Sequence, residues 1–442
     1  MRLSYGFADL AGAAERVAAA TAVVPARTSQ HPVPEAPRVA NPRHAEYTEG
    51  LASARHRLAA AVRVGDGSCG PSRARNSTES EQENVSKKTT AGNFFEDFTV
   101  GHVFRHAVPR TVYDGDLALY IALTGDRRPL HCSAEFARSL GFQRETVHDL
   151  LVFHLVFGRA VQDISLNSPA NLGYADVRFV RPVYTGDTLR AETAVLGKRE
   201  TSRGDVGIVW VHTKGFNQRD EIVLQFYRWA MVNKRAPQTA TGANDAPDLP
   251  AQVSAEHLAV PAELDLSKFD TVATGSNAFW EDYEVGERIV HPQGITMEDA
   301  EHQMATRLYQ NTARVHFNHQ LQEKSRLGHR IIYGGHVIST VHAISNDGLE
   351  NALRVMAFNA GSHANPTVAG DTLYAWTDVL QKIDLGRTDA AAVRLRLVGI
   401  KNVDPNQEPI ALKVKDAKSG REQYHPNVVL DLDYTVLMPK RR

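Results

Sequence analysis

Cysteine is scarce in this sequence of 442 residues, which holds only Cys69 and Cys132. The two cysteines form no CxxC pair and no metal-type cluster, so nothing indicates a disulfide framework or a zinc site. Long apolar runs are also missing, since none approaches the length that a membrane span requires. The sequence therefore predicts a fold stabilised by its hydrophobic core, in a reducing compartment such as the cytoplasm.

Charge of one sign is not in excess either. The 50 Lys and Arg residues face 51 Asp and Glu residues, which gives a formal net charge of −1. Such a balance provides no whole-molecule field for attracting nucleic acid or a membrane surface, so neither is expected as a partner. Hydrophobic residues make up 42% and charged residues 23%, a profile typical of a folded globular protein.

Residues 1–91 differ in composition from the rest of the chain. They are rich in Ala, Arg, Pro and Ser, and the stretch 72–90 is almost wholly polar. A segment of this kind buries too little apolar surface to offset the entropy lost on ordering, which predicts a disordered extension without a catalytic role. A transit peptide is the alternative, and it would place the protein in an organelle matrix.

Beyond this extension the chain repeats itself. FFEDF at 94–98 is answered by FWEDY at 279–283, which is 185 positions later. Further on, GDTL at 186–189 is answered by GDTL at 370–373, at an offset of 184. Matches in nearly constant register indicate duplication of one fold unit. We therefore predict a first repeat at 92–235, a linker rich in Ala, Pro, Asp and Thr at 236–276, and a second repeat at 277–442.

Each repeat has the same order of predicted elements. A helical stretch such as 114–123 is followed by a loop and an apolar helix, at 150–164 in the first repeat and 336–344 in the second. Period-two patterns then predict long strands, for example at 191–196 and 207–212. A buried helix followed by antiparallel strands is an α+β arrangement, and pairing the two repeats side by side would cover an open sheet edge. The Gly186-Asp187 dipeptide is typical of a hairpin turn.

The strongest local motif is YIALTGDRRPLHCSAEFA at 120–137. Gly125 allows a tight turn, Pro129 stiffens the loop, and Ser133 is a plausible helix cap. The loop would hold Asp126 and His131 close together ahead of a helix, and acid–base work on a water molecule needs such a pair.

This string resembles the signature of the MaoC-like dehydratases, the hydratase-2 family of hot-dog enzymes. The resemblance implies a tandem (double) hot-dog fold, in which each repeat is an antiparallel sheet wrapped around a central helix. It also implies a hydro-lyase that acts on an acyl-coenzyme A (acyl-CoA) thioester, with no metal and no cofactor beyond the coenzyme A of the substrate. The acid–base pair would fall on Asp126 and His131, answered in the second repeat by Asn311 and His316 at the offset of 185.

The two repeats differ at the position where the family has a glycine whose backbone N–H polarises the thioester carbonyl. The second repeat has Gly334 and Gly335 there, whereas the first has Asp149. Asp126 favours the first repeat as the site of the base, because Asn311 can orient a water molecule but cannot take its proton. The glycines favour the second repeat, so the sequence leaves open which repeat holds the working site.

Three longer strings resemble the mesaconyl-CoA hydratases within this family: GNFFEDFTVGHVFRHAVPRT from residue 92, LLVFHLVFGRAVQDISLN from 150 and ANLGYADVRF from 170. They imply hydration of mesaconyl-CoA to β-methylmalyl-CoA. A dicarboxylic substrate needs a cation, and Arg128, Arg307 and Arg314 are the candidates nearest in sequence to the pairs. The alternatives are an (R)-specific enoyl-CoA hydratase or 3-hydroxyacyl dehydratase of fatty-acid metabolism, and a non-catalytic thioester-binding protein. Exposed sheet edges would also allow a homo-oligomer.

Overall fold

The computed structural model describes residues 89–325, 327–417 and 420–441, so residues 1–88 of the extension predicted at 1–91 lie outside the described residues. No helix in these ranges is both long enough and apolar enough to span a lipid bilayer.

The first repeat forms helices before strands. In chain order it contains η1 (Phe95–Asp97), β1 (Val103–Arg105), β2 (Arg110–Thr111), α2 (Asp114–Thr124), α3 (Pro129–Cys132), α4 (Ala134–Ser139), α5 (Asp149–Ala160), η2 (Val161–Ser165), β3 (Ala170–Phe179), β4 (Thr188–Glu200), β5 (Val206–Phe216) and β6 (Ile222–Asn233). The segment predicted to be a linker carries only short elements: β7 (Asn244–Asp245), η3 (Ala255–His257), η4 (Leu266–Lys268) and α6 (Thr271–Thr274).

The second repeat follows the same order. It contains η5 (Trp280–Asp282), β8 (Arg288–Val290), β9 (Ile295–Thr296), α7 (Asp299–Tyr309), α8 (Arg314–Phe317), α9 (His319–Gln322), α10 (Gly334–Ile344), β10 (Arg354–His363), β11 (Thr372–Ile383), β12 (Ala390–Lys401), β13 (Lys413–Lys415), β14 (Glu422–Tyr424) and β15 (Val428–Pro439).

Both repeats contribute to one antiparallel sheet of 13 strands, in the order β1-β4-β5-β6-β3-β10-β15-β12-β11-β8. The second half of this order mirrors the first, because each strand has its counterpart at the same distance from the centre. The repeats meet where β3 pairs with β10, with Phe358 opposite Val177 and Gly361 opposite Tyr174. Side-by-side pairing therefore covers one edge of each repeat's sheet, as expected.

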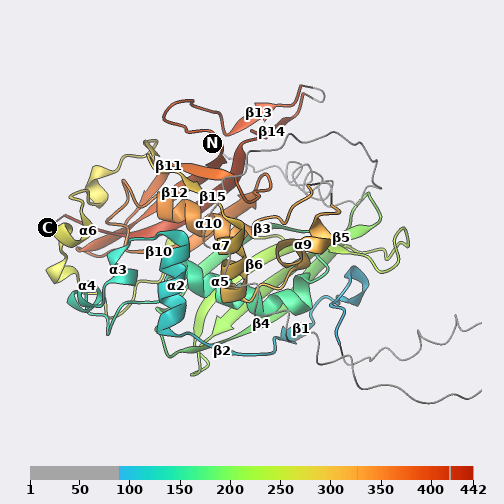
Figure 1. The fold of residues 1–442 in the computed structure, drawn as a ribbon. Helices are drawn as coiled ribbons and strands as arrows, with labels where there is room; N and C mark the ends of the chain where they lie inside the picture. Colours follow the sequence, from blue (N-terminus) through green and yellow to red (C-terminus); the bar gives the residue numbers. More distant parts are fainter. Residues whose placement is uncertain (1–88, 326, 418–419, 442) are drawn as a thin grey trace, which may run out of the picture. The chain divides into compact units, whose positions relative to one another are not determined.

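The central helices α5 and α10 lie against this sheet (Figure 1). Every residue of α5 is buried, as its almost wholly apolar sequence predicts. Each central helix also contacts a helix of the other repeat, α5 with α7 and α10 with α2. One hydrophobic core therefore extends through both repeats.

The turn at Gly186-Asp187 requires one correction. Gly186 has a φ of 96°, and the Asp187 carboxylate accepts a hydrogen bond from the Tyr184 N–H at 3.0 Å, so the turn forms. The strands on either side of it, β3 and β4, are not neighbours in the sheet. The turn therefore begins a crossing connection rather than a hairpin, because turn chemistry fixes a change of direction but not the partner of the next strand.

Candidate active site

A cleft that is partly open to solvent lies between residues of the two repeats. Three of the residues that the sequence singles out line it: Asn311, His316 and Gly334. The remaining wall combines second-repeat residues with a set from the first repeat that includes Phe157, Ser165, Ser168, Pro169, Ala170, Asn171 and Tyr174. A substrate in this cleft would touch both repeats.

His316 is held in one orientation by the backbone. It belongs to the short helix α8, and its Nδ1 lies 2.8 Å from the carbonyl oxygen of Ile331. A carbonyl only accepts hydrogen bonds, so Nδ1 carries the proton and Nε2 keeps a lone pair. Burial lowers the pKa of His316 to about 4, so the imidazole is neutral at pH 7 and can accept a proton at Nε2.

Asn311 is almost completely buried next to the end of α7. The preceding residue, Gln310, caps that helix in the left-handed conformation with a φ of 53°, which turns the chain toward the cleft. The Asn311 side-chain oxygen accepts a hydrogen bond from the Ala313 N–H at 3.1 Å, so the amide NH₂ remains as the donor end.

Gly334 is the first residue of α10, where backbone N–H groups have no partner within the helix. A Cβ atom at this position would lie 2.4 Å from Cε1 of His363, so only glycine allows the helix to begin against that imidazole. Gly335 is buried one position further along and is not among the residues around the cleft. The N-terminus of α10 thus presents N–H donors and a partial positive charge to the cleft.

His363 was not singled out from the sequence. It lines the cleft, its Nε2 lies 3.2 Å from the Tyr174 hydroxyl, and burial lowers its pKa to about 4. At the offset of 184 its counterpart in the first repeat is Phe179. A histidine that replaces an apolar residue of the other repeat is a signal that could have identified it.

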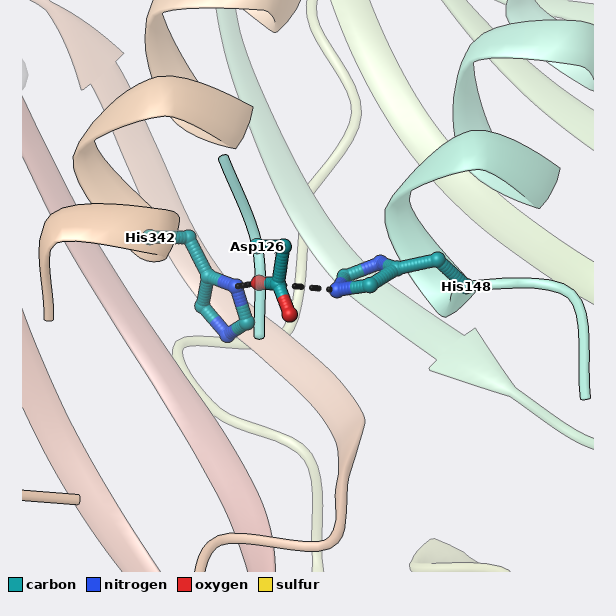
Figure 2. Close-up of side chains that lie close together, drawn as sticks. All are labelled: Asp126, His148 and His342. Carbon is teal, nitrogen blue, oxygen red and sulfur yellow. Dashed lines mark hydrogen bonds and ion pairs between the residues drawn. The ribbon is translucent and has the colours of Figure 1, made fainter. Parts of the chain in front are cut away.

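The pair in the first repeat has a different environment. Asp126 lies between His148 and His342 (Figure 2), with its Oδ2 at 3.3 Å from His148 Nε2 and 3.6 Å from His342 Nδ1. Its closest partner is Arg128, whose Nη1 is 2.5 Å from the same oxygen. Burial acts to raise the pKa of Asp126, but Arg128 and His148 outweigh it and hold the pKa well below its usual range. The ion pair with Arg128 therefore keeps Asp126 charged and engaged within the protein.

His131 does not reach Asp126 directly, since no hydrogen bond joins the two within the described residues. Its Nδ1 lies 3.2 Å from the Thr146 carbonyl oxygen, which is the counterpart of the contact between His316 and Ile331. Its ring instead packs against His148, with centroids 4.4 Å apart. Burial lowers the pKa of His131 well below its usual value.

Two larger side chains, one from each repeat, stand at the positions that correspond to two residues of the cleft lining. At the offsets of 185 and 184, Gly334 corresponds to Asp149 and Ala170 corresponds to Arg354. Asp149 and Arg354 are both buried and form an ion pair with 2.6 Å between Oδ1 and Nη2. Where the second repeat leaves room for a ligand, the first holds a buried salt bridge.

The three arginines proposed for a substrate carboxylate lie away from the cleft lining. Arg128 is buried and uses its guanidinium on Asp126, the His342 carbonyl and Ser345, so its charge is already balanced within the protein. Arg307 is exposed on α7, and Arg314 is exposed at the start of α8, 3.4 Å from the Asn167 side-chain oxygen. None of the three lines the cleft.

Asp126, His148 and His342 also place one possible metal-ligand atom each within 4.8 Å of one another. The guanidinium of Arg128 already brings a positive charge to the shared carboxylate. A metal ion there would be held against a second cation, so these residues fit a hydrogen-bonded ion pair better than a metal site.

Comparison with known proteins places the chain in a family. A family model described as mesaconyl-CoA hydratase matches residues 76–417. The chain belongs to the mesaconyl-CoA hydratase family. Among curated members and relatives, the β-methylmalyl-CoA dehydratase of Chloroflexus aurantiacus is 50% identical over 358 residues, which cover 81% of this chain and 100% of the relative. The mesaconyl-CoA hydratase of Cereibacter sphaeroides is 48% identical over 353 residues, which cover 80% of this chain and 100% of the relative.

Solved structures agree with this membership. A MaoC domain protein from Chloroflexus aurantiacus has a TM-score of 0.76 at 50% identity and covers 81% of this chain and 100% of its own. A Mycobacterium tuberculosis protein described as having a double hot-dog fold has a TM-score of 0.62 at 24% identity, and the match covers 78% of this chain and 98% of that protein. This second likeness supports the fold alone. The predicted α+β double hot-dog fold is confirmed, and this family member is a hydro-lyase whose substrate is a CoA thioester.

Proposed function

We propose that the protein hydrates mesaconyl-CoA to β-methylmalyl-CoA in the cleft of the second repeat. The observation that carries this proposal is the meeting of Asn311, His316 and the N-terminus of α10 in one cleft. The activities named for the two relatives with about 50% identity support the choice of substrate.

In the proposed reaction His316 is the acid–base group. Its Nε2 takes a proton from a water molecule while the water oxygen bonds to Cβ of the unsaturated acyl group. The electrons of the double bond move toward the thioester oxygen, and the N–H groups at the start of α10 stabilise the negative charge that develops there. The imidazolium then returns a proton to Cα, so that one water molecule has been added.

Asn311 has a different part in this scheme from that of an aspartate. Its amide NH₂ can donate a hydrogen bond to the water oxygen and orient a lone pair toward Cβ, but it takes no proton at neutral pH. The scheme therefore uses one base rather than a pair. It needs no cofactor, because the protein supplies the proton transfer and the coenzyme A belongs to the substrate.

Substituting the two equivalent histidines tests this assignment. His316→Gln should lower the rate of mesaconyl-CoA hydration, followed by the loss of absorbance of the conjugated thioester, by on the order of 10²–10⁴-fold. His131→Gln is the matched control, since it occupies the corresponding position in the first repeat, and it should keep most of the rate.

Three results would contradict the proposal. Loss of activity in His131→Gln with retention in His316→Gln would move the site to the first repeat. Faster hydration of crotonyl-CoA than of mesaconyl-CoA would favour an enoyl-CoA hydratase of fatty-acid type. Binding of both thioesters without any change in absorbance would indicate a non-catalytic binding protein.

A further inference from the structure

Arg228 is a buried cation beside the cleft. It lies on β6 opposite Tyr174 of β3, and its relative exposure is 0%. Its guanidinium stacks over the ring of Phe157, with 4.1 Å from Cζ to the ring centroid, and its Nη1 lies 3.4 Å from the hydroxyl of Ser165. Phe157, Ser165 and Tyr174 all line the cleft, so the guanidinium lies directly behind its wall.

The charge of Arg228 has no counterpart in the protein. No carboxylate lies within 4.0 Å of it in the part of the chain that the structure describes, whereas the buried Arg128 and Arg354 pair with Asp126 and Asp149. Burial lowers the pKa of Arg228 to about 10, so it is still charged at pH 7. A buried charge without an opposite charge is unfavourable, and an anionic ligand would remove that penalty.

The atoms of Arg228 that lack a partner are themselves informative. Its Nε and Nη2 are buried and have no hydrogen-bond partner among the described residues. These two N–H groups form one edge of the guanidinium, which matches the two oxygens of a carboxylate. In this protein Arg178 and Arg387 bind Asp176 and Asp389 through the same two atoms. The edge left open on Arg228 is therefore the one that this chain uses elsewhere for carboxylates.

Asn171 gives a second, independent indication of a polar ligand. It lies on β3 and lines the cleft. Both its side-chain oxygen and its side-chain nitrogen are buried without a hydrogen-bond partner in the described ranges. Buried amide groups in native proteins are nearly always satisfied, and a polar ligand on the β3 side of the cleft would satisfy this one.

We propose that Arg228 determines specificity by binding the free carboxylate of a dicarboxylic acyl-CoA, with Asn171 completing the polar wall. This inference deepens the proposed function and rests on the same cleft. Arg128 differs from Arg228 in already being paired with Asp126, and Arg307 and Arg314 differ in being exposed. Arg228 has no carboxylate partner among the described residues and contacts Phe157 and Ser165 of the cleft wall. The thioester end would lie toward Asn311, His316 and Gly334 of the second repeat, and the carboxylate end toward β3 and β6 of the first.

The test uses binding, so that it does not depend on turnover. Succinyl-CoA and butyryl-CoA are saturated thioesters of equal chain length that differ by a terminal carboxylate, and calorimetry measures the affinity of the full chain for each. We expect the unaltered protein to prefer succinyl-CoA. Arg228→Met should weaken succinyl-CoA binding by on the order of a hundredfold and leave butyryl-CoA within about threefold.

Two further variants separate recognition from folding. Arg228→Lys keeps the charge but loses the paired N–H edge, so it should retain part of the preference. Arg314→Met, an exposed arginine of α8, should retain all of it. Thermal unfolding of each variant confirms that the fold is intact.

The inference is overturned if the unaltered protein shows no preference for succinyl-CoA, or if Arg228→Met weakens both thioesters equally. A protein that prefers succinyl-CoA through Arg228 but does not hydrate mesaconyl-CoA would support this inference and contradict the proposed function. The two ideas therefore fail in different measurements.

Discussion

The buried ion pair between Asp149 and Arg354 is the feature that closes the first repeat, and it can be removed without touching the proposed site. The perturbation consists of Asp149→Leu, Arg354→Met and the double variant. In the structure, Asp149 Oδ1 lies 2.6 Å from Arg354 Nη2, and Oδ2 accepts a hydrogen bond from the Val355 N–H at 3.0 Å. The two residues are 5% and 4% exposed, so solvent screens the pair very little.

The magnitude follows from what each variant leaves behind. Arg354→Met leaves a buried carboxylate that keeps the Val355 N–H and His131, whose Nε2 is 3.9 Å from Oδ2, but no permanent cation. Asp149→Leu leaves a buried guanidinium. Each single variant should therefore lower the free energy of unfolding by about 3–5 kcal/mol. The double variant replaces both charges with apolar groups and leaves the Val355 N–H unpaired. It should therefore lower the free energy of unfolding by about 1–3 kcal/mol. Its loss should therefore be far smaller than the sum of the two single losses.

Urea unfolding of the four proteins gives these free energies as a double-mutant cycle, and mesaconyl-CoA hydration is measured on the same samples. We expect a favourable coupling of several kcal/mol and, for the double variant, a hydration rate within about threefold of the unaltered protein. Additive losses would refute the ion pair as a structural element. A double variant that is stable but loses hydration would refute the assignment of catalysis to the second repeat.

Four further predictions concern the cleft and the buried histidines. Because the pKa of His316 is about 4 and its neutral form is the base, kcat/KM should fall with decreasing pH only near pH 4; a fall centred near 6.5 would contradict this. Asn311→Asp places a carboxylate in the same cleft, so it should raise the pKa of His316 and move that fall to higher pH, which a pH–rate profile measures. Gly334→Ala brings a Cβ to 2.4 Å from His363 and should lower kcat by about a hundredfold, whereas Gly115→Ala, with nothing within 4 Å, should not. Burial lowers the pKa of His336 from 6.5 to about 4, so on acidification the unfolded chain takes up this proton before the folded chain does. The free energy of unfolding measured in urea should therefore fall as the pH drops below 6.5 and level off near pH 4, and His336 should account for about 3 kcal/mol of the loss.

Much of the fold follows from local sequence patterns. The alternation in 191–196 and 207–212 lies inside β4 and β5, and the apolar stretch 150–164 became α5 followed by the π-helical turn η2. Ser133 caps α4 by accepting a hydrogen bond from the Phe136 N–H, as expected from its type and place. These features depend on neighbours within a few positions, and such neighbours are visible in the sequence.

The features that were missed depend on residues far apart in the chain. The motif around Asp126 looks complete, but whether Arg128 points to substrate or folds back onto the carboxylate depends on the space around it. The guanidinium also contacts His342 and Ser345, which lie 214 and 217 positions away in the sequence. Arg228 stands in the middle of β6 and Asn171 near the start of β3, and strand periodicity gives the face of a side chain but not what lies across from it.

The duplication explains why one repeat can lose an open site without the protein losing one. The cleft of this protein combines the N-terminus of α10 in the second repeat with β3 of the first. Filling the first repeat's space with Asp149 and Arg354 leaves β3 unchanged, because that strand serves the opposite cleft. The second repeat then supplies the groups that act on the thioester, while the first supplies Arg228 and Asn171. On this view neither repeat alone could hydrate a dicarboxylic thioester, because the reacting end and the recognised end of the substrate lie on different halves of the duplication.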